Sequence, residues 1–303
     1  MNKEINSIFI GASGFIGRYI TAPFPQNKII KTYHNNYIEN GVKINLENIN
    51  FKSFFDNYPN TNKVFILCGL TNFNSIIANP KLAFSINVTL IKNLLKEIHS
   101  RNIKPIFFSS ESVFDGINGD YVETDSPKPT FEYGYFKKEI EDYIIKTFND
   151  FLIFRLSKVF DSDFKNNTLV TSWINKILIS EDIYCANDNY FSPIHVYDLI
   201  EFILKIVNND ESNGIYHLSS NEYLSRKEML EILINQLPHN FNMKSDIFYQ
   251  SLHDFPIASS QPLNTTLNSS KVIKFSNFQP SNFKFWINQI LNQKYYNNFF
   301  EID

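Results

Sequence analysis

The stretch Gly11-Ala12-Ser13-Gly14-Phe15-Ile16-Gly17 decides the fold that this sequence predicts. It follows the apolar run 6–10 directly and opens a segment of helical character, so its glycines stand at the spacing GxxGxxG in a strand-to-helix turn. Gly11 allows a tight exit from the strand, Gly14 lets the backbone approach a pyrophosphate, and Gly17 lets the helix pack closely on the sheet. The first helical turn adds unpaired N–H groups. With Ser13, Phe15 and Ile16 between the glycines, the stretch is a candidate phosphate loop, and the alternative is an ordinary strand-helix turn.

Strand-like and helix-like segments alternate through the first half of the chain. Expected strands, rich in β-branched and aromatic residues, cover 6–11, 28–33, 63–68, 105–109 and 151–156. Expected amphipathic helices begin at Phe15 and cover 80–101 and 132–148. This alternation predicts an α/β fold of the Rossmann type, with a doubly wound parallel sheet whose carboxyl strand ends carry the site.

The second half of the chain is looser in pattern. Asn, Ser and Asp cluster at 161–167 and 208–213, and prolines recur at 256, 262 and 280. We therefore expect two domains. A Rossmann domain that binds NAD(P) should cover residues 1–160, with a returning segment near 184–210, and a smaller α+β substrate-binding domain should cover residues 161–303.

The composition excludes several classes of protein. The 303 residues are 43% hydrophobic and 19% charged, which is too apolar for a disordered tail, and the net charge of −3 argues against a nucleic-acid partner. The longest apolar run, 64–70, is too short to cross a membrane, and the N-terminus lacks signal-peptide features, so we expect a cytoplasmic protein without a membrane partner. Cys68 and Cys185 stand apart and the histidines show no ligand spacing, so we expect no metal.

Ser110, Tyr133 and Lys137 are candidate catalytic residues. Tyr133 and Lys137 lie one helical turn apart on an expected helix, hence on one face, and Ser110 ends an apolar strand. We expect the Lys137 ammonium to lower the pKa of the Tyr133 phenol, so that Tyr133 donates a proton to the oxygen of a carbonyl that receives a hydride. Lys137 would also bind the nicotinamide ribose, and the Ser110 hydroxyl would donate to the carbonyl oxygen. A second pair with this spacing, Tyr223 and Lys227, lacks a comparable serine, and we interpret it as structural.

The end of the second expected strand bears on the choice of cofactor. An acidic residue there would hold the ribose 2′-hydroxyl of NAD, but the sequence is Lys31-Thr32-Tyr33-His34-Asn35-Asn36. Without a carboxylate, and with Lys31 and His34 nearby, this strand end tolerates a 2′-phosphate. NADPH is therefore the favoured cofactor, with His34 beside it, and NADH is the alternative if these are solvated loop residues.

Further motifs, each different, are spread over most of the chain, from the glycine-rich stretch to Pro262-Leu263-Asn264. They include 67–72 (LCGLTN), 109–116 (SSESVFDG), 133–139 (YGYFKKE), 154–157 (FRLS), 166–167, 196–199 and 214–218. Together they resemble the extended short-chain dehydrogenase/reductases, and within them the dTDP-4-dehydrorhamnose reductases. The resemblance implies that Ser110, Tyr133 and Lys137 are catalytic and that Glu111 assists proton transfer or orients the sugar. It also implies cofactor contacts for Cys68, Gly69, Tyr133 and Lys137, and substrate contacts for Thr71, Ser110, Phe114, Lys158 and Asn166.

The resemblance is incomplete where those reductases hold their substrate. The tryptophan that they carry after the fifth strand is Lys158 here, and the arginine before Pro262 is Gln261. The resemblance implies NAD(P)H-dependent reduction of a nucleotide-linked 4-keto-6-deoxy sugar, in the synthesis of deoxysugars for cell-surface polysaccharides. The nucleotide and the sugar stay open.

The same motifs occur in proteins of other functions, and the sequence argues against some of these functions more strongly than against others. A dehydratase of this superfamily needs two adjacent carboxylates after the catalytic hydroxyl, and Glu111-Ser112 offers only one. A nucleotide-sugar epimerase shares the three catalytic residues and stays open, as does a non-catalytic NADP-binding regulatory subunit, although the complete set of three argues against the latter. The helices 80–101 and 132–148 either pair across the two-fold axis of a homodimer, as the resemblance implies, or bury their apolar faces on the sheet.

Overall fold

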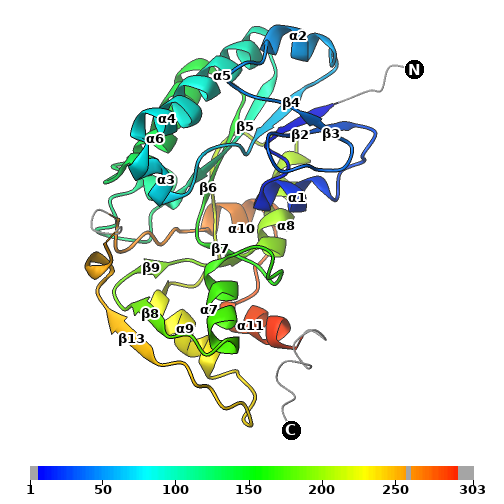
Figure 1. Cartoon of the computed structure of the whole chain (residues 1–303). Helices are drawn as coiled ribbons and strands as arrows, with labels where there is room; N and C mark the ends of the chain where they lie inside the picture. Colours follow the sequence, from blue (N-terminus) through cyan, green and yellow to red (C-terminus); the bar gives the residue numbers. More distant parts are fainter. Residues whose placement is uncertain (1–5, 257–260, 293–303) are drawn as a thin grey trace. The chain divides into compact units, whose positions relative to one another are not determined.

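The computed structural model describes residues 6–256 and 261–292 (Figure 1). The chain divides into two compact units. The first comprises the residues up to Val113 together with Ser126–Arg155 and Val207–Tyr216. The second comprises Phe114–Asp125, Leu156–Ile206 and the residues from His217 onward. Each unit therefore joins segments that are far apart in the sequence.

A seven-stranded sheet in the order β11-β6-β5-β4-β1-β2-β3 forms the centre of the first unit. Its strands are β1 (Ser7–Ile10), β2 (Ile29–Tyr33), β3 (Gly41–Lys43), β4 (Lys63–Ile66), β5 (Lys104–Ser110), β6 (Leu152–Leu156) and β11 (Gly214–Leu218). The pairings of β1 with β2 and β4, of β2 with β3, and of β4 with β5 are parallel. The order confirms the predicted doubly wound sheet and places the reversal of strand order between β1 and β4.

Helices cover both faces of this sheet. Figure 1 shows α4, α5 and α6 along one face and α1 on the other. In chain order the helices are α1 (Phe15–Thr21), α2 (Phe51–Asp56), α3 (Phe73–Ala78), α4 (Pro80–Phe84), the π-helix η1 (Ser85–Thr89), α5 (Leu90–Ser100), the 3₁₀ turn η2 (Glu111–Val113) and α6 (Glu132–Thr147). These helices supply the crossovers that parallel strands require.

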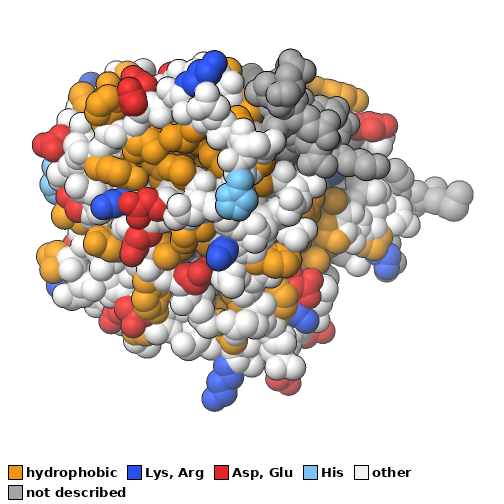
Figure 2. Space-filling view, turned by 90° about the horizontal axis from the view of Figure 1, so that it is seen from below, with side chains coloured by type: hydrophobic (Ala, Val, Ile, Leu, Met, Phe, Trp, Pro, Cys, Tyr) orange, Lys and Arg blue, Asp and Glu red, His pale blue; other side chains and the backbone are white. Residues whose placement is uncertain are grey.

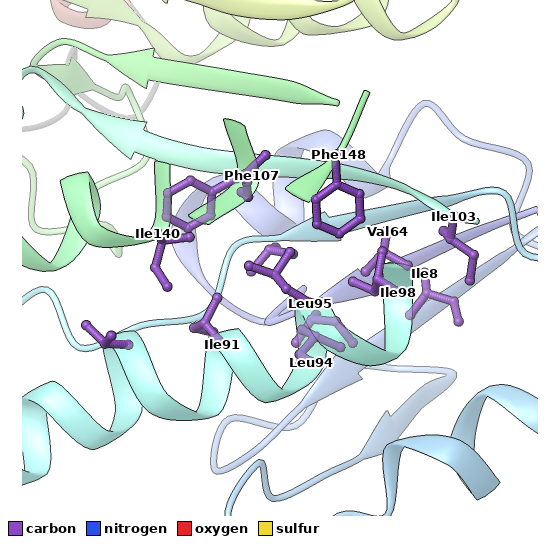
Figure 3. Packing of buried hydrophobic residues seen from close by; sticks show 14 of the residues in the cluster. Ile8, Val64, Ile91, Leu94, Leu95, Ile98, Ile103, Phe107, Ile140 and Phe148 are labelled. Atoms are coloured by element: carbon purple, nitrogen blue, oxygen red, sulfur yellow. The ribbon is translucent and has the colours of Figure 1, made fainter. Parts of the chain in front are cut away.

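One buried cluster of the first unit lies between α5 and the sheet. Figure 3 shows the apolar side chains of α5 directed at the strands, as the helical spacing of these residues requires. The buried cluster includes Ile91, Leu94, Leu95 and Ile98 of α5, Ile8 of β1, Val64 of β4, Phe107 of β5 and Ile140 of α6. Burial of a leucine or isoleucine side chain contributes about 1.5–3 kcal/mol, so this face holds α5, and with it the loops at the strand ends, in place.

The expected helix 80–101 is interrupted in the structure. It consists of α4, the π-helical η1 and α5. Asn87 lies in η1, and its side chain accepts a hydrogen bond from the Leu70 N–H (2.8 Å) and donates one to the Leu70 carbonyl (3.1 Å). Single turns of π-helix are frequent at functional sites because they re-aim a side chain. Here the turn directs an amide at the loop that follows β4.

The second unit has its own hydrophobic core. Its elements are β7 (Val159–Phe160), α7 (Leu169–Leu178), β8 (Ile183–Ala186), β9 (Tyr190–Phe191), β10 (Ile194–His195), α8 (Val196–Val207), β12 (Leu224–Ser225), α9 (Arg226–Ile234), β13 (Ile247–Gln250), η3 (Leu252–Asp254), α10 (Ser270–Ser276) and α11 (Phe283–Leu291). Trp173 of α7, Leu230 of α9 and Ile287 of α11 share one buried cluster. On the face seen in Figure 2, charged side chains of both signs are scattered among hydrophobic and uncharged ones.

The segment that returns to the first unit differs from the one expected near 184–210. It is Val207–Tyr216, which leads into β11 beside β6. Residues 183–186 instead form β8, which pairs with β13 inside the second unit. An apolar strand does not reveal its partner in the sequence, and this is the reason for the difference. Among the described helices, none is both long and apolar enough to cross a membrane.

Candidate active site

The glycine-rich stretch forms the turn between β1 and α1. Gly11 has a φ of +89°, and a Cβ there would lie 2.8 Å from the Cys68 amide nitrogen, so only glycine fits between the two strand ends. A Cβ at Gly17 would lie 2.6 Å from the Ala12 carbonyl oxygen, so α1 packs tightly on the turn. A Cβ at Gly14 would meet only the Gly11 carbonyl oxygen, at 3.4 Å. The turn is thus closed around Gly11 and Gly17 and open at Gly14, which fits a pyrophosphate laid against Gly14.

A cavity of about 640 Å³ lies at the reversal of strand order, within the first unit. Four of the predicted cofactor residues, Gly11, His34, Cys68 and Gly69, line it. Among its described lining residues there is no lysine or arginine, and Lys31 is not one of them. A bound 2′-phosphate would therefore have His34 and the neighbouring asparagines as its polar contacts on this wall.

The same cavity is lined by residues that the sequence analysis did not single out. They are Ile44, Asn45, Leu46 and Glu47 after β3, and Leu82, Ile86 and Leu90 along the interrupted helix. β3 has only three residues and was not expected as a strand, so the segment after it gave no signal. The apolar spacing of residues 82, 86 and 90 was visible, but the cavity wall and the sheet both require such spacing. The apolar side and the polar side of the cavity together suit a planar base attached to a ribose.

The loop after β4 is held by the side chain of Asn87. Gly69 has a φ of +157°, and a Cβ there would lie 2.7 Å from Asn87 Oδ1. Together with the two hydrogen bonds to Leu70, this contact fixes residues 68–70 beside the glycine-rich turn. Thr71, predicted to contact substrate, follows in an exposed position. Asn87 therefore braces the backbone at the cavity edge.

Helix α6 carries Tyr133 and Lys137 onto the end of β5. Gly134 makes this possible, because a Cβ there would lie 2.1 Å from the Ser112 carbonyl oxygen and 2.8 Å from Pro129 Cβ. The helix backbone can therefore touch the segment that contains Ser110 and Glu111. The Tyr133 ring lies edge-on to Phe73, with ring centroids 5.9 Å apart. The structure thus brings the elements of the predicted catalytic residues together.

Each of these side chains has a defined local partner. Lys137 Nζ donates to the Phe108 carbonyl of β5 (2.7 Å) and lies 5.6 Å from the centroid of the Tyr133 ring. Ser110 Oγ donates to Ser112 Oγ (3.1 Å) and accepts from the Ser112 N–H (3.2 Å). Ser110 and Glu111 are buried, whereas Tyr133 and Lys137 are partly exposed. The two helix residues are accordingly open to a ligand.

The pKa directions at this site differ from those expected. Burial, and then the charge of Glu111, raises the pKa of Tyr133. Burial lowers the pKa of Lys137 to about 8, against the raising effect of Cys68 and Glu141. The expected lowering of the Tyr133 pKa by Lys137 is therefore not what the structure gives, because burial of the phenol raises this pKa. The Lys137 ammonium lies 5.6 Å from the centroid of the Tyr133 ring and donates its hydrogen bond to the Phe108 carbonyl. Tyr133 holds its proton at neutral pH.

A buried network behind these residues was missed by sequence reasoning. Arg155 Nη2 donates to Glu141 Oε2 (2.7 Å), and both side chains are 1% exposed. The Ser109 hydroxyl donates to the same carboxylate. Glu141 lies one turn after Lys137 and Arg155 lies in β6, so their spacing along the chain gave no signal that they meet.

The remaining predicted substrate residues belong to the second unit. Phe114 is fully buried and stacks on Tyr121, with ring centroids 4.2 Å apart, and its contact with substrate stays a prediction. Asn166 is largely buried and donates to Asp161 Oδ2 (2.6 Å). Lys158 is partly exposed, with Nζ 4.8 Å from the centroid of the Phe191 ring.

The second tyrosine-lysine pair does not form on a helix. Tyr223 precedes β12, and Lys227 belongs to α9. The Tyr223 hydroxyl donates to Asp120, and Lys227 lies 3.8 Å from Glu231. Burial and this aspartate raise the pKa of Tyr223. These contacts agree with the structural interpretation of the pair.

The strand order, the glycine-rich turn and the cavity at the switch point define an α/β protein of the Rossmann class. Residues 8–296 match the family described as the RmlD substrate binding domain, and the chain belongs to this family. The resemblance to dTDP-4-dehydrorhamnose reductases that the motifs predict is thereby confirmed at the level of the family.

Individual relatives carry two kinds of name. The chain is 25% identical over 298 residues to the methionine adenosyltransferase 2 subunit beta of Xenopus tropicalis. The matched region covers 94% of this chain and 86% of that protein. It is 25% identical over 214 residues to the dTDP-4-dehydrorhamnose reductase of Aggregatibacter actinomycetemcomitans, which covers 67% of this chain and 71% of that protein. A crystal structure of the dTDP-4-dehydrorhamnose reductase of Bacillus anthracis in complex with NADP matches with a TM-score of 0.78, at 19% identity, over 95% of this chain and 98% of that one.

Proposed function

We propose that this protein reduces a nucleotide-linked 4-keto-6-deoxy sugar with NAD(P)H. The observation that carries the proposal is the close approach of Gly134 to the Ser112 carbonyl, by which α6, with Tyr133 and Lys137, contacts the segment that follows Ser110. A partly exposed tyrosine and lysine at the carboxyl end of a parallel sheet stand where Rossmann-class proteins bind their ligands. The family relationship and the relatives named as reductases support the same reaction.

The cofactor proposed for this chain is NADPH, with NADH as an alternative. The open space at Gly14 and the cavity lined by Gly11, His34 and Gly69 fit the pyrophosphate and the adenosine half. When bound, the dinucleotide supplies the hydride. His34 is the candidate contact of a 2′-phosphate, because the described wall of the cavity offers no lysine or arginine.

The catalytic roles proposed for the residues follow from their protonation and position. Tyr133 keeps its proton at neutral pH, which is the form needed to donate to an alkoxide that grows on the substrate. Lys137, with its remaining ammonium protons, holds the ribose next to Tyr133 and stabilises the phenolate after the transfer. Ser110 donates to the substrate oxygen by turning its hydroxyl away from Ser112. Glu111 orients the sugar from its buried position beside the phenol.

A second candidate function is that of a regulatory subunit of another enzyme. It is favoured by one observation: relatives named as beta subunits of methionine adenosyltransferase 2 match 94% of the chain, whereas the reductase from A. actinomycetemcomitans matches 67%. The presence of Ser110, Tyr133 and Lys137 in adjoining elements argues for the reductase.

One experiment separates these functions. The protein is mixed with NADPH and a panel of nucleotide 4-keto sugars, and the absorbance of the reduced cofactor is followed together with the sugar products. Consumption of one NADPH for each sugar supports the reductase. Conversion of a sugar without net consumption supports an epimerase, and cofactor binding without turnover of any sugar supports the regulatory role.

A further inference from the structure

A buried carboxylate links α6 to the two neighbouring strands behind the candidate active site. Arg155 Nε lies 3.2 Å from both oxygens of Glu141, and Arg155 Nη2 lies 2.7 Å from Oε2. The hydroxyl of Ser109 donates to Oε1 of the same carboxylate. Glu141 belongs to α6, Ser109 to β5 and Arg155 to β6, so this one side chain ties the helix to both strands.

This network adjoins the candidate catalytic residues on two sides. Ser109 immediately precedes Ser110 at the end of β5. Glu141 lies four residues after Lys137 on α6, so the two side chains lie on one face of the helix. Any displacement of the carboxylate would therefore move both the strand end that carries Ser110 and a negative charge one helical turn from Lys137.

Stability alone does not account for this ion pair. Both side chains are 1% exposed, and removing two charges from water costs about as much as their attraction returns. Apolar side chains of similar volume often pack such a position at least as well. The pair does, however, place a fixed negative charge within one helical turn of Lys137, which apolar side chains would not provide.

Resting on the proposed function, we propose that Glu141 is a positioning residue that places a fixed carboxylate one helical turn from Lys137 and fixes the end of β5 that carries Ser110. Arg155 holds the carboxylate in place, and Ser109 transmits its position to the strand. None of the three contacts the reacting atoms.

The electrostatics of Lys137 agree with this role. Burial lowers the pKa of Lys137 to about 8, and Cys68 and then Glu141 act in the opposite direction. The ammonium also contacts the Phe108 carbonyl and lies over the Phe107 ring, both from β5, and over the Tyr133 ring from α6, with Glu111 acting on Tyr133 from η2. Without the charge of Glu141 the pKa of Lys137 falls further, so a larger share of Lys137 is neutral at neutral pH.

The first test reads the charge of Lys137 without turnover. The protein is trace-labelled with acetic anhydride across a series of pH values, and the labelling of Lys137 is measured by mass spectrometry. We expect the midpoint of Lys137 labelling to fall by about one pH unit in Glu141→Gln. The matched control is Glu139→Gln, the same change two residues earlier on α6 at an exposed glutamate paired with Lys92, and it should leave the midpoint unchanged.

Folding is checked separately in each variant. Glu141→Gln leaves the Arg155 charge buried without its partner, so melting and NADPH binding are measured alongside the labelling. If Glu141→Gln does not fold, the labelling of Lys137 is measured across the same pH values in the double variant Glu141→Gln/Arg155→Gln, in which neither charge remains. Glu141→Asp retains the carboxylate and should restore the midpoint toward that of the native protein.

The second test uses the pH profile of kcat/KM in the NADPH-dependent reaction. The alkaline limb should move to lower pH in Glu141→Gln and return toward its native position in Glu141→Asp, while Ser109→Ala should lower kcat about tenfold with no shift of the limb. An unchanged labelling midpoint in Glu141→Gln would overturn the inference. Absence of turnover in the native protein would instead count against the proposed function, and the labelling result would still decide the role of Glu141.

Discussion

Replacing Gly134 by alanine should separate α6 from the strand end that carries Ser110. The added Cβ would lie 2.1 Å from the Ser112 carbonyl oxygen and 2.8 Å from Pro129 Cβ, whereas real Cβ contacts lie beyond 3.0 Å. The first clash involves backbone, so relief requires α6 and the segment 110–112 to move apart by about 1 Å. A misplacement of about 1 Å between reacting groups costs on the order of 10²-fold in rate. Kcat should fall by about that factor.

The effect on stability is smaller because two contributions oppose each other. Overpacking costs about 1–3 kcal/mol, whereas alanine is favoured over glycine inside a helix by about 1 kcal/mol. The free energy of unfolding should therefore fall by no more than about 2 kcal/mol. NADPH affinity should change little, because neither Gly134 nor Ser112 is among the described residues that line the cavity.

The assay compares Gly134→Ala with Tyr135→Ala, a substitution at the next residue, which is 55% exposed. Steady-state reduction of the nucleotide sugar gives kcat, fluorescence of the reduced cofactor gives its affinity, and urea unfolding gives the stability. Turnover in Gly134→Ala within about threefold of Tyr135→Ala would refute the argument that the close approach of Gly134 to Ser112 positions the site.

Three further outcomes are expected. Tyr133→Phe should lose most of the turnover and keep its NADPH affinity, because only the proton donor is removed. Tyr223→Phe, which loses a hydroxyl bound to Asp120, should turn over at nearly the native rate. Near-native activity of Tyr133→Phe would contradict the role of Tyr133 as proton donor. Burial lowers the pKa of His195 to about 3. Between about pH 6.5 and pH 4 the unfolded chain therefore binds a proton that the native protein does not. As the pH falls through this range, the free energy of unfolding should decrease by up to about 1.4 kcal/mol per pH unit. Urea unfolding at several pH values should show this slope in the native protein and a flatter one in His195→Gln, and equal slopes would count against the burial of a neutral imidazole. Leu94→Ala, at a fully buried position of α5, should lower the free energy of unfolding by about 2–5 kcal/mol. Ile145→Ala, at a side chain that is 47% exposed, should lower it by less than about 1 kcal/mol. Similar losses in both variants would contradict the packing described for the core.

The fold could be predicted from the sequence because its signals are local. The spacing of Gly11, Gly14 and Gly17 and the alternation of apolar strands with amphipathic helices depend on neighbouring residues only, and the sheet order agrees with them. The spacing of Tyr133 and Lys137 and the strand that ends at Ser110 are local patterns too, and they identify candidate catalytic residues. Their roles stay predictions until the variants are measured.

Other features depend on which distant residues meet, and no pattern along the chain reports that. The interruption of the helix 80–101 at Asn87, the contact of Gly134 with Ser112, and the ion pair of Glu141 with Arg155 each join elements that the sequence places separately. The same holds for the direction of the Tyr133 pKa, because loss of hydration depends on how much protein surrounds the phenol.

The sequence by itself therefore determined the α/β class, the glycine-rich turn and the residues most suited to chemistry, since periodicity and turn geometry are properties of adjacent residues. Only the tertiary structure decided which segment returns to the sheet, which residues line the cavity and which charges face Lys137. Packing sets those distances, and burial sets the strength of the charges that act across them.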